Sequence, residues 1–318
     1  MSRQNPVIPP PAFLVSLLIL TLAHFARAES SPSSFAYILQ ADSFAKTKSA
    51  AVAQLKESGR DWIVLDTSFA GDTPWERANL DAIRSGKAGR KVVAYISIGE
   101  AEDYRPYWQP EWGSGGKRMA AAPAWLGIEN PEWKGNYQVK YWNAEWQKLM
   151  LAAIDDAMGR GFDGVYLDIV DGFQTYERQG ADNYLDDRMN PETKQTYRRD
   201  MVDWVKAIAS RARAKNPAAL VIPQNGSQLA AHKDFVELIS AQGIEDLFTN
   251  GKKLQPASHT DEILGHLKTL ASAKKPVLLI EYPKTPERQA LSKKLAEENG
   301  LVWLVTDRQL KTLGESGK

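Results

Sequence analysis

Two aspartates close a stretch of sequence that otherwise has the pattern of a buried strand. From Phe162 to Val170 most residues are apolar or β-branched, yet Asp168 lies near the end of this run and Asp171 follows it. Buried carboxyl groups are costly, and the carboxyl ends of parallel strands are where α/β proteins bind substrates. We therefore treat both aspartates as candidates for chemistry. The simpler alternative is that Asp168 caps a loop and Asp171 is solvated.

Other polar side chains stand where the remaining strands are expected to end. They are Asp66, Glu100, Asn225, Glu245 and Glu281. If the strands close into a barrel, all of these ends face one mouth, where several acids together suit acid–base chemistry. Neighbouring carboxyl groups also raise one another's pKa values, so that one acid can stay protonated while another is ionised. The alternative for Glu245 is a carboxylate at a helix start, stabilised by the helix dipole.

The elements that would position these side chains alternate between strands and helices. Apolar and β-branched runs predict strands over residues 35–40, 61–68, 91–100, 162–170, 220–225, 238–245, 276–282 and 301–306. Apolar residues at helical spacing predict helices over residues 43–58, 74–84, 144–158, 190–215, 261–273 and 286–299, with Asn190 as the N-cap of the longest. Eight strands interleaved with helices are typical of an α/β fold of the (βα)8 TIM-barrel type.

The segment between Glu100 and Asn143 is too long for an ordinary connection after the third strand. It is rich in aromatic residues, among them Tyr104, Trp108, Trp112, Trp125 and Trp133. Aromatic rings offer flat apolar area to sugar rings, so this long insertion suits a carbohydrate groove, which at least one of Tyr104, Trp108 and Trp112 should line. The alternative is that the aromatic side chains only hold the loop on the barrel.

The first residues have the pattern of a secretory signal. Arg3 precedes an apolar run from Ala12 to Ala23, and residues 26–28 (ARA) have the small-x-small pattern of a cleavage site. We expect residues 1–28 to be removed, residues 29–318 to form a single TIM-barrel domain, and the protein to be exported to the periplasm or the cell exterior. The alternative, an uncleaved anchor helix, is weaker because the apolar run is shorter than the ~20 residues that span a bilayer.

Composition and motifs argue against several classes of function. The formal net charge is +1, which gives no electrostatic reason to bind nucleic acid or an anionic membrane. The chain has no cysteine, so thiolate nucleophiles, disulfides and cysteine-ligated metals are excluded. Its four histidines never fall at metal-ligand spacing, and neither a phosphate-binding glycine loop nor a G-x-S-x-G elbow occurs. We therefore expect no metal, no cofactor and a monomer without stable membrane insertion after signal cleavage.

Three motifs in this order resemble those of glycoside hydrolase family 114, which contains the endo-α-1,4-polygalactosaminidases. They are residues 95–102 (YISIGEAE) with Arg105, Tyr107 and Trp108 after them, residues 161–168 (GFDGVYLD), and residues 243–248 (GIEDLF). The resemblance extends from Tyr37 to Asp307. It implies a TIM barrel that acts on α-1,4-linked galactosamine-rich polysaccharide, with Asp168 and Glu245 as its catalytic pair.

The physical interpretation agrees with this resemblance. A glycosidase needs one carboxyl group to protonate the departing oxygen and a second to attack the anomeric carbon or activate water. We assign Asp168 as the nucleophile and Glu245, between apolar neighbours, as the proton donor, and expect retention of configuration. The residues expected to contact substrate are Tyr37, Asp66, Tyr95, Glu100, Trp108, Tyr166, Asp171, Asn225 and Glu281. The alternative function is a catalytically silent barrel that binds polysaccharide or assists its export.

Overall fold

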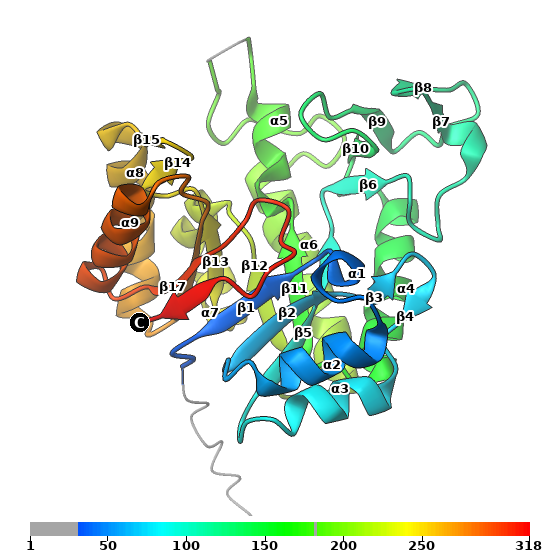
Figure 1. Cartoon of the computed structure of the whole chain (residues 1–318). Helices are drawn as coiled ribbons and strands as arrows, with labels where there is room; N and C mark the ends of the chain where they lie inside the picture. The colour runs from blue at the N-terminus through cyan, green and yellow to red at the C-terminus, as the bar shows by residue number, and fades with distance from the viewer. Residues whose placement is uncertain (1–30, 181–182) are drawn as a thin grey trace, which may run out of the picture. The chain divides into compact units, whose positions relative to one another are not determined.

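Eight parallel strands form the centre of the chain in the computed structural model, which describes residues 31–180 and 183–318 (Figure 1). They are β1 Phe35–Ile38, β2 Trp62–Asp66, β5 Lys91–Ser97, β11 Gly164–Asp168, β12 Leu220–Pro223, β13 Gln242–Glu245, β16 Val277–Glu281 and β17 Val302–Val305. Each lies within a run that the sequence predicts as a strand, so the α/β class is confirmed. The predicted signal at residues 1–28 lies outside the described residues.

These strands follow chain order across two sheets. One sheet has the order β1, β2, β5, β11 and β12, and the other contains β13, β16 and β17 in that order. A parallel bridge between Gln224 and Gly243 joins the two sheets, and the Asn225 amide donates to Gly243 O at 2.8 Å. Neighbouring parallel strands in chain order are the arrangement on which a (βα)8 barrel is built.

The side between the last and the first parallel strand differs from the predicted barrel. Within residues 31–180 and 183–318, no ladder joins β17 to β1, and β18 (Glu315–Gly317) instead pairs antiparallel with β17. The segment near β18 bonds to the first sheet, because the Leu39 amide donates to Leu310 O at 2.9 Å and the Arg60 guanidinium donates to Gly314 O at 2.7 Å. This C-terminal segment, red beside the blue β1 in Figure 1, fills the place of a closing ladder.

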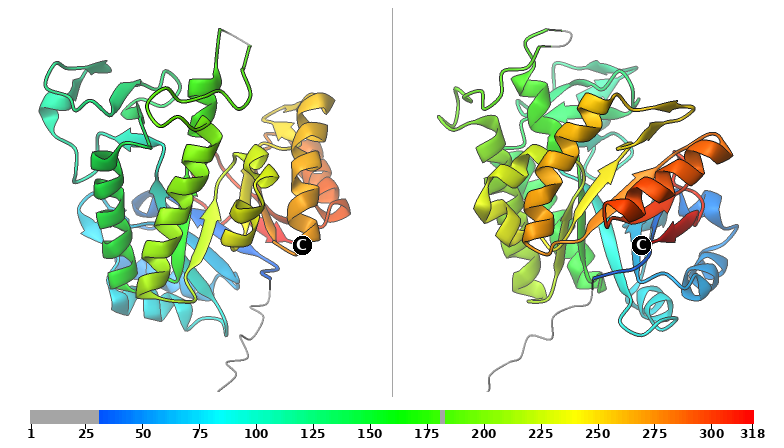
Figure 2. Two further views of the ribbon diagram at one scale, coloured as in Figure 1. Left: turned by 180° about the vertical axis from the view of Figure 1, so that it is seen from behind. Right: turned by 90° about the vertical axis from the view of Figure 1, so that its left-hand side faces the viewer.

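Helices lie on the outer side of the strands, as the two further views in Figure 2 show. They are α1 Ala41–Phe44, α2 Lys48–Glu57, α3 Arg77–Arg84, α4 Ala144–Arg160, α5 Phe173–Glu177, α6 Tyr197–Lys215, α7 Lys233–Leu238, α8 Ala257–Ser272 and α9 Pro286–Glu298. The helix predicted over residues 43–58 is interrupted and forms α1 and α2. The strand predicted from residue 238 starts later, because α7 occupies the chain as far as Leu238.

Side-chain alternation along the strands divides the interior into two hydrophobic clusters. On β5, Val92, Ala94 and Ile96 pack in the cluster that the helices share, whereas Val93 and Tyr95 pack in a second cluster. The second cluster, here called the inner core, also contains Phe35, Tyr37, Trp62, Val64, Tyr166, Leu220, Ile222, Leu278, Ile280, Tyr282, Val302 and Leu304. Tyrosines form the end of the inner core that lies toward the carboxyl ends of the strands.

The start of α6 corrects the predicted helix over residues 190–215. Thr196 caps the helix by accepting a hydrogen bond from the Arg199 amide at 3.1 Å, and Asn190 lies outside it. Asn190 is buried, donates Nδ2 to Asp200 Oδ2 at 2.7 Å and accepts from the Glu192 amide at 3.0 Å. The asparagine side chain therefore stabilises a turn before the helix, a role that this residue type performs as readily as helix capping.

The insertion between β5 and α4 contains a small sheet that the sequence did not predict. β6 Glu100–Glu102, β10 Asn136–Val139 and β9 Leu126–Glu129 pair antiparallel in this spatial order. Much of its aromatic content packs internally: the rings of Trp112 and Trp125 are 5.3 Å apart, and those of Trp125 and Trp146 on α4 are 5.0 Å apart. These aromatic residues fasten the insertion to the outside of the strands, as the structural alternative proposed.

Short elements complete the described chain. They are the strands β3 Ser68–Ala70, β4 Thr73–Pro74, β7 Gly113–Ser114, β8 Lys117–Arg118, β14 Thr249–Asn250 and β15 Lys253–Leu254, and the 3-10 helices η1 Pro110–Trp112, η2 Val170–Gly172 and η3 Ser227–Ala231. A search of the described helices for one long and apolar enough to cross a membrane finds none.

Candidate active site

A cavity of about 980 Å³, here called the first cavity, opens at the carboxyl ends of the parallel strands. Of the residues predicted to act on or contact substrate, Tyr37, Tyr95, Glu100, Asp168, Asp171, Asn225 and Glu245 line it. Further lining comes from the insertion and from the segments after β11, β16 and β17. It includes Glu102, Tyr104, Ile128, Trp133, Lys134, Gln174, Arg178, Tyr184, Tyr282 and Arg308. Side chains from most of the chain's length therefore converge on one site.

The backbone turns sharply at Ile169, directly after β11, and so places two acids in the first cavity. Ile169 has φ 56°, in the left-handed region, which is a strained conformation for a β-branched residue. Its amide donates to Asp168 Oδ1 at 2.9 Å, and η2 then carries Asp171 into the same cavity. Gly99 permits this turn, because a Cβ at that position would lie 2.2 Å from Ile169 O.

The next two strands end in the same way. Asn225 after β12 has φ 57°, and Asp246 after β13 has φ 51°. Asn225 and Glu245 hold one another, because the Glu245 amide donates to Asn225 Oδ1 at 3.2 Å while Asn225 Nδ2 donates to Glu245 Oε1 at 3.3 Å. Non-glycine residues in this conformation are uncommon and cluster at functional sites. Their occurrence after three neighbouring strands makes this edge of the sheet the candidate site.

Each of the two candidate catalytic carboxyl groups accepts a hydrogen bond from a tyrosine of the inner core. Tyr95 donates its hydroxyl to Asp168 Oδ2 at 2.7 Å, and Tyr282 donates its hydroxyl to Glu245 Oε2 at 2.9 Å. Tyr37 packs beside them, with its ring 6.2 Å from that of Tyr95. Because these rings are packed in the inner core, their hydroxyl groups hold both carboxyl groups in a fixed orientation.

The electrostatics of the first cavity favour protonated carboxyl groups. Burial, and then the charge of Glu245, raise the pKa of Asp168 to about 8. Burial and the same charge raise the pKa of Asp171 to about 7. Burial also raises the pKa of Glu245, opposed by its hydrogen bonds from Tyr282 and Asn225. Two interacting carboxyl groups of this kind titrate as a pair, and the raised pKa of Asp168 keeps a proton on the pair near neutral pH.

Four residues predicted as substrate contacts lie away from the first cavity. Tyr166 is buried beneath Tyr37, with their rings 5.1 Å apart. Glu281 is buried and accepts from the Phe248 amide at 2.7 Å, which stabilises the turn after β13. The other two are Asp66 and Trp108. None of the four is among the residues that line the first cavity in the described chain.

Asp66 and Trp108 have partners of their own. Asp66 accepts two hydrogen bonds from Arg105, at 3.0 and 2.7 Å, and borders a neighbouring cavity. Trp108 packs on Tyr137, with the ring centroids 4.8 Å apart, and edge-on against Trp112. Of the three aromatic residues predicted to line the groove, Tyr104 lines the first cavity, whereas Trp108 and Trp112 do not.

Several residues of the first cavity were not predicted from the sequence. Ile128, Trp133 and Tyr184 stand at its rim with exposed fractions of 65%, 53% and 47%. Tyr282 and Arg308 were also missed. Alternation on β16 could have identified Tyr282, because Leu278 and Ile280 face the inner core, so that residue 282 faces inward while Glu281 faces outward.

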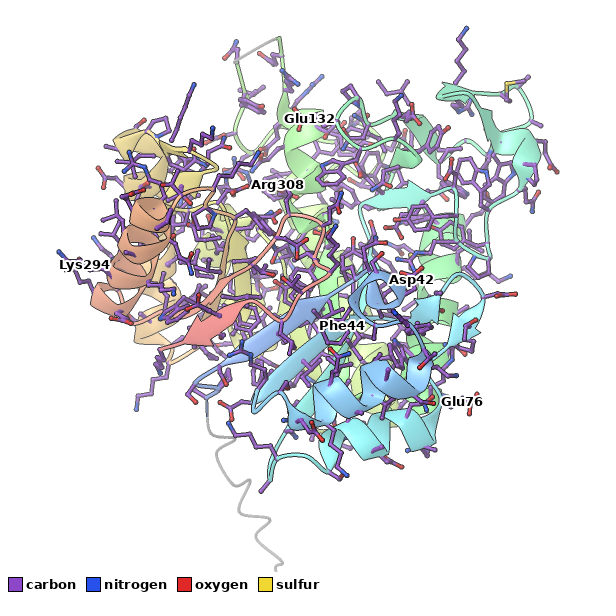
Figure 3. All side chains as sticks on the ribbon, viewed as in Figure 1. Asp42, Phe44, Glu76, Glu132, Lys294 and Arg308 are labelled. Carbon is purple, nitrogen blue, oxygen red and sulfur yellow. The ribbon has the colours of Figure 1, made fainter. Side chains whose placement is uncertain are left out.

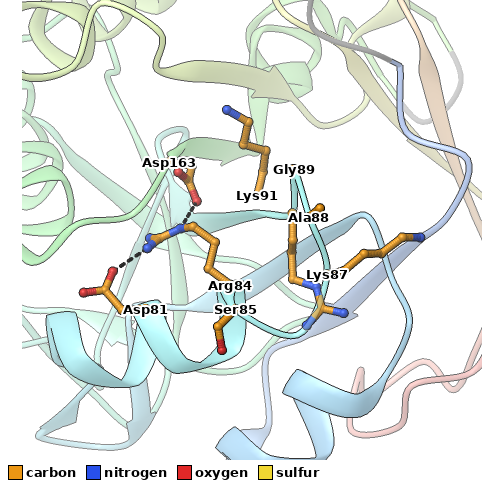
Figure 4. Close-up of a pocket in the computed structure, with 9 residues that line it drawn as sticks. Asp81, Arg84, Ser85, Lys87, Ala88, Gly89, Lys91 and Asp163 are labelled. Carbon is orange, nitrogen blue, oxygen red and sulfur yellow. Dashed lines mark hydrogen bonds and ion pairs between the residues drawn. The ribbon is translucent and has the colours of Figure 1, made fainter.

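A separate cavity of about 630 Å³ lies at the start of β5, at the opposite end of the sheet (Figure 4). Arg84 forms ion pairs with the two acidic residues of this cavity, donating to Asp163 Oδ2 at 2.9 Å and to Asp81 Oδ1 at 2.5 Å. This ion-pair group lies at the strands' amino ends, where TIM-barrel residues serve stability. Across the described residues, no group of three or more acidic or histidine side chains is placed to hold a metal ion.

Two relatives match most of this chain in sequence. The chain is 36% identical over 253 residues to an uncharacterized protein of Deinococcus radiodurans, and the match covers 79% of this chain and 74% of the other. It is 34% identical over 239 residues to the uncharacterized protein MJ1477 of Methanocaldococcus jannaschii, covering 74% of this chain and 64% of the other.

Two solved structures share the fold. The glycoside hydrolase domain of PelA from Pseudomonas aeruginosa matches with a TM-score of 0.61 and 20% identity, over 90% of this chain and 99% of that domain. Ega3 of Aspergillus fumigatus, in complex with galactosamine, matches with a TM-score of 0.61 and 20% identity, over 89% of this chain and 94% of that one. The family model described as glycoside-hydrolase family GH114 matches residues 69–317. The chain therefore belongs to glycoside hydrolase family GH114.

Proposed function

We propose that this glycoside hydrolase cleaves an α-1,4-linked, galactosamine-rich polysaccharide through Asp168 and Glu245. The observation that carries the proposal is the pair of tyrosine-held carboxyl groups in one cavity, on strands separated only by β12. Family membership supports the reaction type, and the complex of the fold relative Ega3 with galactosamine supports the choice of sugar.

In the proposed mechanism, Asp168 attacks the anomeric carbon while Glu245 protonates the departing oxygen, which gives a covalent intermediate and retention of configuration. This reaction needs the shared proton on Glu245. The raised pKa of Asp168 favours the opposite placement in the free protein. A substrate ammonium group near Asp168 stabilises its carboxylate, so binding of an amino sugar moves the proton toward Glu245.

Stereochemistry tests this assignment. NMR of the first-formed product from an α-linked substrate should show the α-anomer, because two displacements at the anomeric carbon restore its configuration. If the β-anomer forms first, water attacks the sugar directly and Asp168 does not act as the nucleophile.

The charge of the first cavity supports a cationic substrate. Glu100, Glu102, Asp168, Asp171 and Glu245 line it against the cations Lys134, Arg178 and Arg308. Galactosamine units with a free amino group carry positive charge at neutral pH and so favour ionisation of Asp168, Asp171 and Glu245, whose pKa values are raised in the free protein, whereas N-acetylated units do not. We expect affinity for a deacetylated polymer to fall as salt rises, and binding that ignores both acetylation and ionic strength would contradict the assignment.

Digestion of α-1,4-polygalactosamine tests the function itself. Wild-type protein should release reducing ends, and Asp168→Asn and Glu245→Gln should each lower the rate by at least about a thousandfold. Glu297→Gln, an exposed position on α9 remote from the cavity lining, is the matched control and should keep full activity. If all four proteins bind the polymer and none cleaves it, the chain is a silent binding barrel instead.

We further propose that residues 1–28 direct export and that residues 29–318 act as a single domain in the periplasm or outside the cell. The support is the apolar run and cleavage pattern of the sequence. Cell fractionation with sequencing of the mature N-terminus tests this proposal. A cell-associated protein that keeps residue 1 would contradict it.

A further inference from the structure

A second cavity of about 610 Å³ borders the first. It lies beside the carboxyl ends of β2 and β5 and reaches the surface of α4. The two cavities share the lining residues Leu39, Gln40, Tyr95, Glu102 and Tyr104. Figure 3 labels Asp42 and Arg308, which line the second and the first cavity respectively. The two cavities are therefore adjacent, and the shared side chains form a wall at their border.

Tyr104 stands in this wall with its ring held in place. Its hydroxyl donates to Glu102 Oε1 at 2.7 Å, and the guanidinium of Arg105 lies 5.2 Å from the ring centroid. Arg105 is fixed in turn by its two hydrogen bonds to Asp66. With 61% of the residue exposed, an ordered aromatic ring faces solvent at the border of both cavities. Such a ring can receive a sugar without losing conformational freedom.

The lining of the second cavity combines apolar and acidic groups. Phe69 offers an aromatic face, held by its edge-on contact with Trp75 at 5.7 Å, and Tyr107, Leu149, Ala152 and Ala153 add apolar area. Four carboxyl groups (Asp42, Asp66, Glu102 and Asp156) stand against two cations (Arg105 and Arg160). An amino sugar presents an apolar ring face together with a positive charge, which matches this combination.

We propose that the second cavity binds further amino-sugar units of the same polymer chain whose cleaved linkage lies in the first cavity. The inference rests on the proposed function and adds a second binding region to it. A chain that crosses Tyr104 passes Tyr95, which holds Asp168, so occupancy of both cavities places an internal linkage at the carboxyl pair. The protein then cuts within the polymer, and longer substrates gain binding energy that short ones lack.

Oligosaccharides of α-1,4-linked galactosamine, graded in length, provide the test. For the wild type, kcat/KM should rise with length until both cavities are filled. Ala152 is an exposed residue of α4 that lines only the second cavity, so Ala152→Trp obstructs it without disturbing the core. This variant should lower kcat/KM for long oligomers about fivefold to tenfold, the size of one or two aromatic contacts, and leave the shortest cleaved oligomer unchanged.

Two further variants complete the experiment. Ala144→Trp adds the same side chain to an exposed position of α4 that lines neither cavity, and it should behave like the wild type. Phe69→Ala should reproduce the length-selective loss by removing an aromatic contact instead of adding bulk. Product lengths from the intact polymer, measured by mass spectrometry, should shift in both second-cavity variants.

The outcomes separate this inference from the proposed function. If the wild type cleaves but Ala152→Trp and Phe69→Ala keep its length dependence, or lose activity equally at all lengths, the second cavity holds no substrate. If no oligomer is cleaved, calorimetric binding decides: length-dependent binding that Ala152→Trp weakens supports the second cavity while the hydrolytic function fails. The absence of both cleavage and binding overturns both.

Discussion

Tyr282 donates its hydroxyl to Glu245 at 2.9 Å, as Tyr95 does to Asp168 at 2.7 Å, and Arg308 lies over the Tyr282 ring at 4.3 Å from its centroid. Because hydrogen bonds to charged groups contribute about 1.5–3 kcal/mol, we expect Tyr282→Phe to lower kcat/KM by at least about tenfold. Tyr141→Phe is the control, since Tyr141 is also buried and donates to Tyr197 O at 2.7 Å, far from the carboxyl pair. Equal activity in both variants would show that the phenol of Tyr282 has no part in the reaction.

The pH dependence of kcat/KM should report the proton of the carboxyl pair. Above about pH 8, the raised pKa of Asp168, the carboxyl pair loses the proton that this aspartate holds, so the proton donor is depleted and the rate should fall. Asp171→Asn removes a negative charge that contributes to raising the pKa of Asp168, so this limb should move to lower pH. A profile that stays flat from pH 6 to pH 9 would contradict the shared proton.

Stability should depend on pH through the same aspartate. Its folded pKa of about 8 lies above the ordinary aspartate value of 3.8, so the folded protein keeps a proton that the unfolded chain releases between these values. The free energy of unfolding therefore falls as pH rises through this range. Asn cannot ionise, so Asp168→Asn should melt at least about 2 °C higher than the wild type at pH 8, with little difference at pH 4. Thermal melts at both pH values, with Glu297→Gln as the exposed-acid control, measure this, and a gain equal at the two pH values would point to a cause other than ionisation.

Aromatic residues of the insertion should divide into a binding group and a structural group. Tyr104 and Trp133 are exposed at the rim of the first cavity, so alanine at either position should weaken polymer binding and leave the melting temperature unchanged. Trp125 is 2% exposed and packs between Trp112 and Trp146, so Trp125→Ala should cost about 3–5 kcal/mol of stability. Calorimetry and thermal melts on the three variants distinguish the groups. If all three variants unfold, the aromatic residues of the insertion serve stability and not binding.

The positions of most of the eight parallel strands were predictable because they are short apolar runs that are buried on both sides, whereas β13 has the weaker sequence Gln-Gly-Ile-Glu. The direction of the side chains at the strand ends was harder to predict, because a shift of one position along a strand turns a side chain to the opposite face. Asp168 follows Tyr166 by two positions and shares its inward face, whereas Glu281 alternates with Ile280 and faces outward. An acid at a strand end is therefore evidence for a site only together with the register of its neighbours.

Other features had no readable signal in the sequence. The sheet of β6, β9 and β10 is short, and its pairing joins Glu100–Glu102 to residues far along the chain, which local patterns do not reveal. β18 has the sequence Glu-Ser-Gly, and its pairing with β17 depends on the tertiary arrangement. Asn190 satisfied the local rule for a helix cap, yet a buried bond to Asp200 held it in a turn.

The contacts of residues 310–317 with the first strand and its neighbourhood have a consequence for how the protein is made. Leu310 and Gly314 accept hydrogen bonds from Leu39 and Arg60, and the hydroxyl of Ser316 accepts one from the Phe35 amide at 2.9 Å. The first strand is synthesised well before residues 310–317. Until those residues have folded against it, β1 is an open edge, so the native arrangement on this side is completed late in synthesis. Deleting residues 310–317 would therefore leave the first strand available for pairing with other chains.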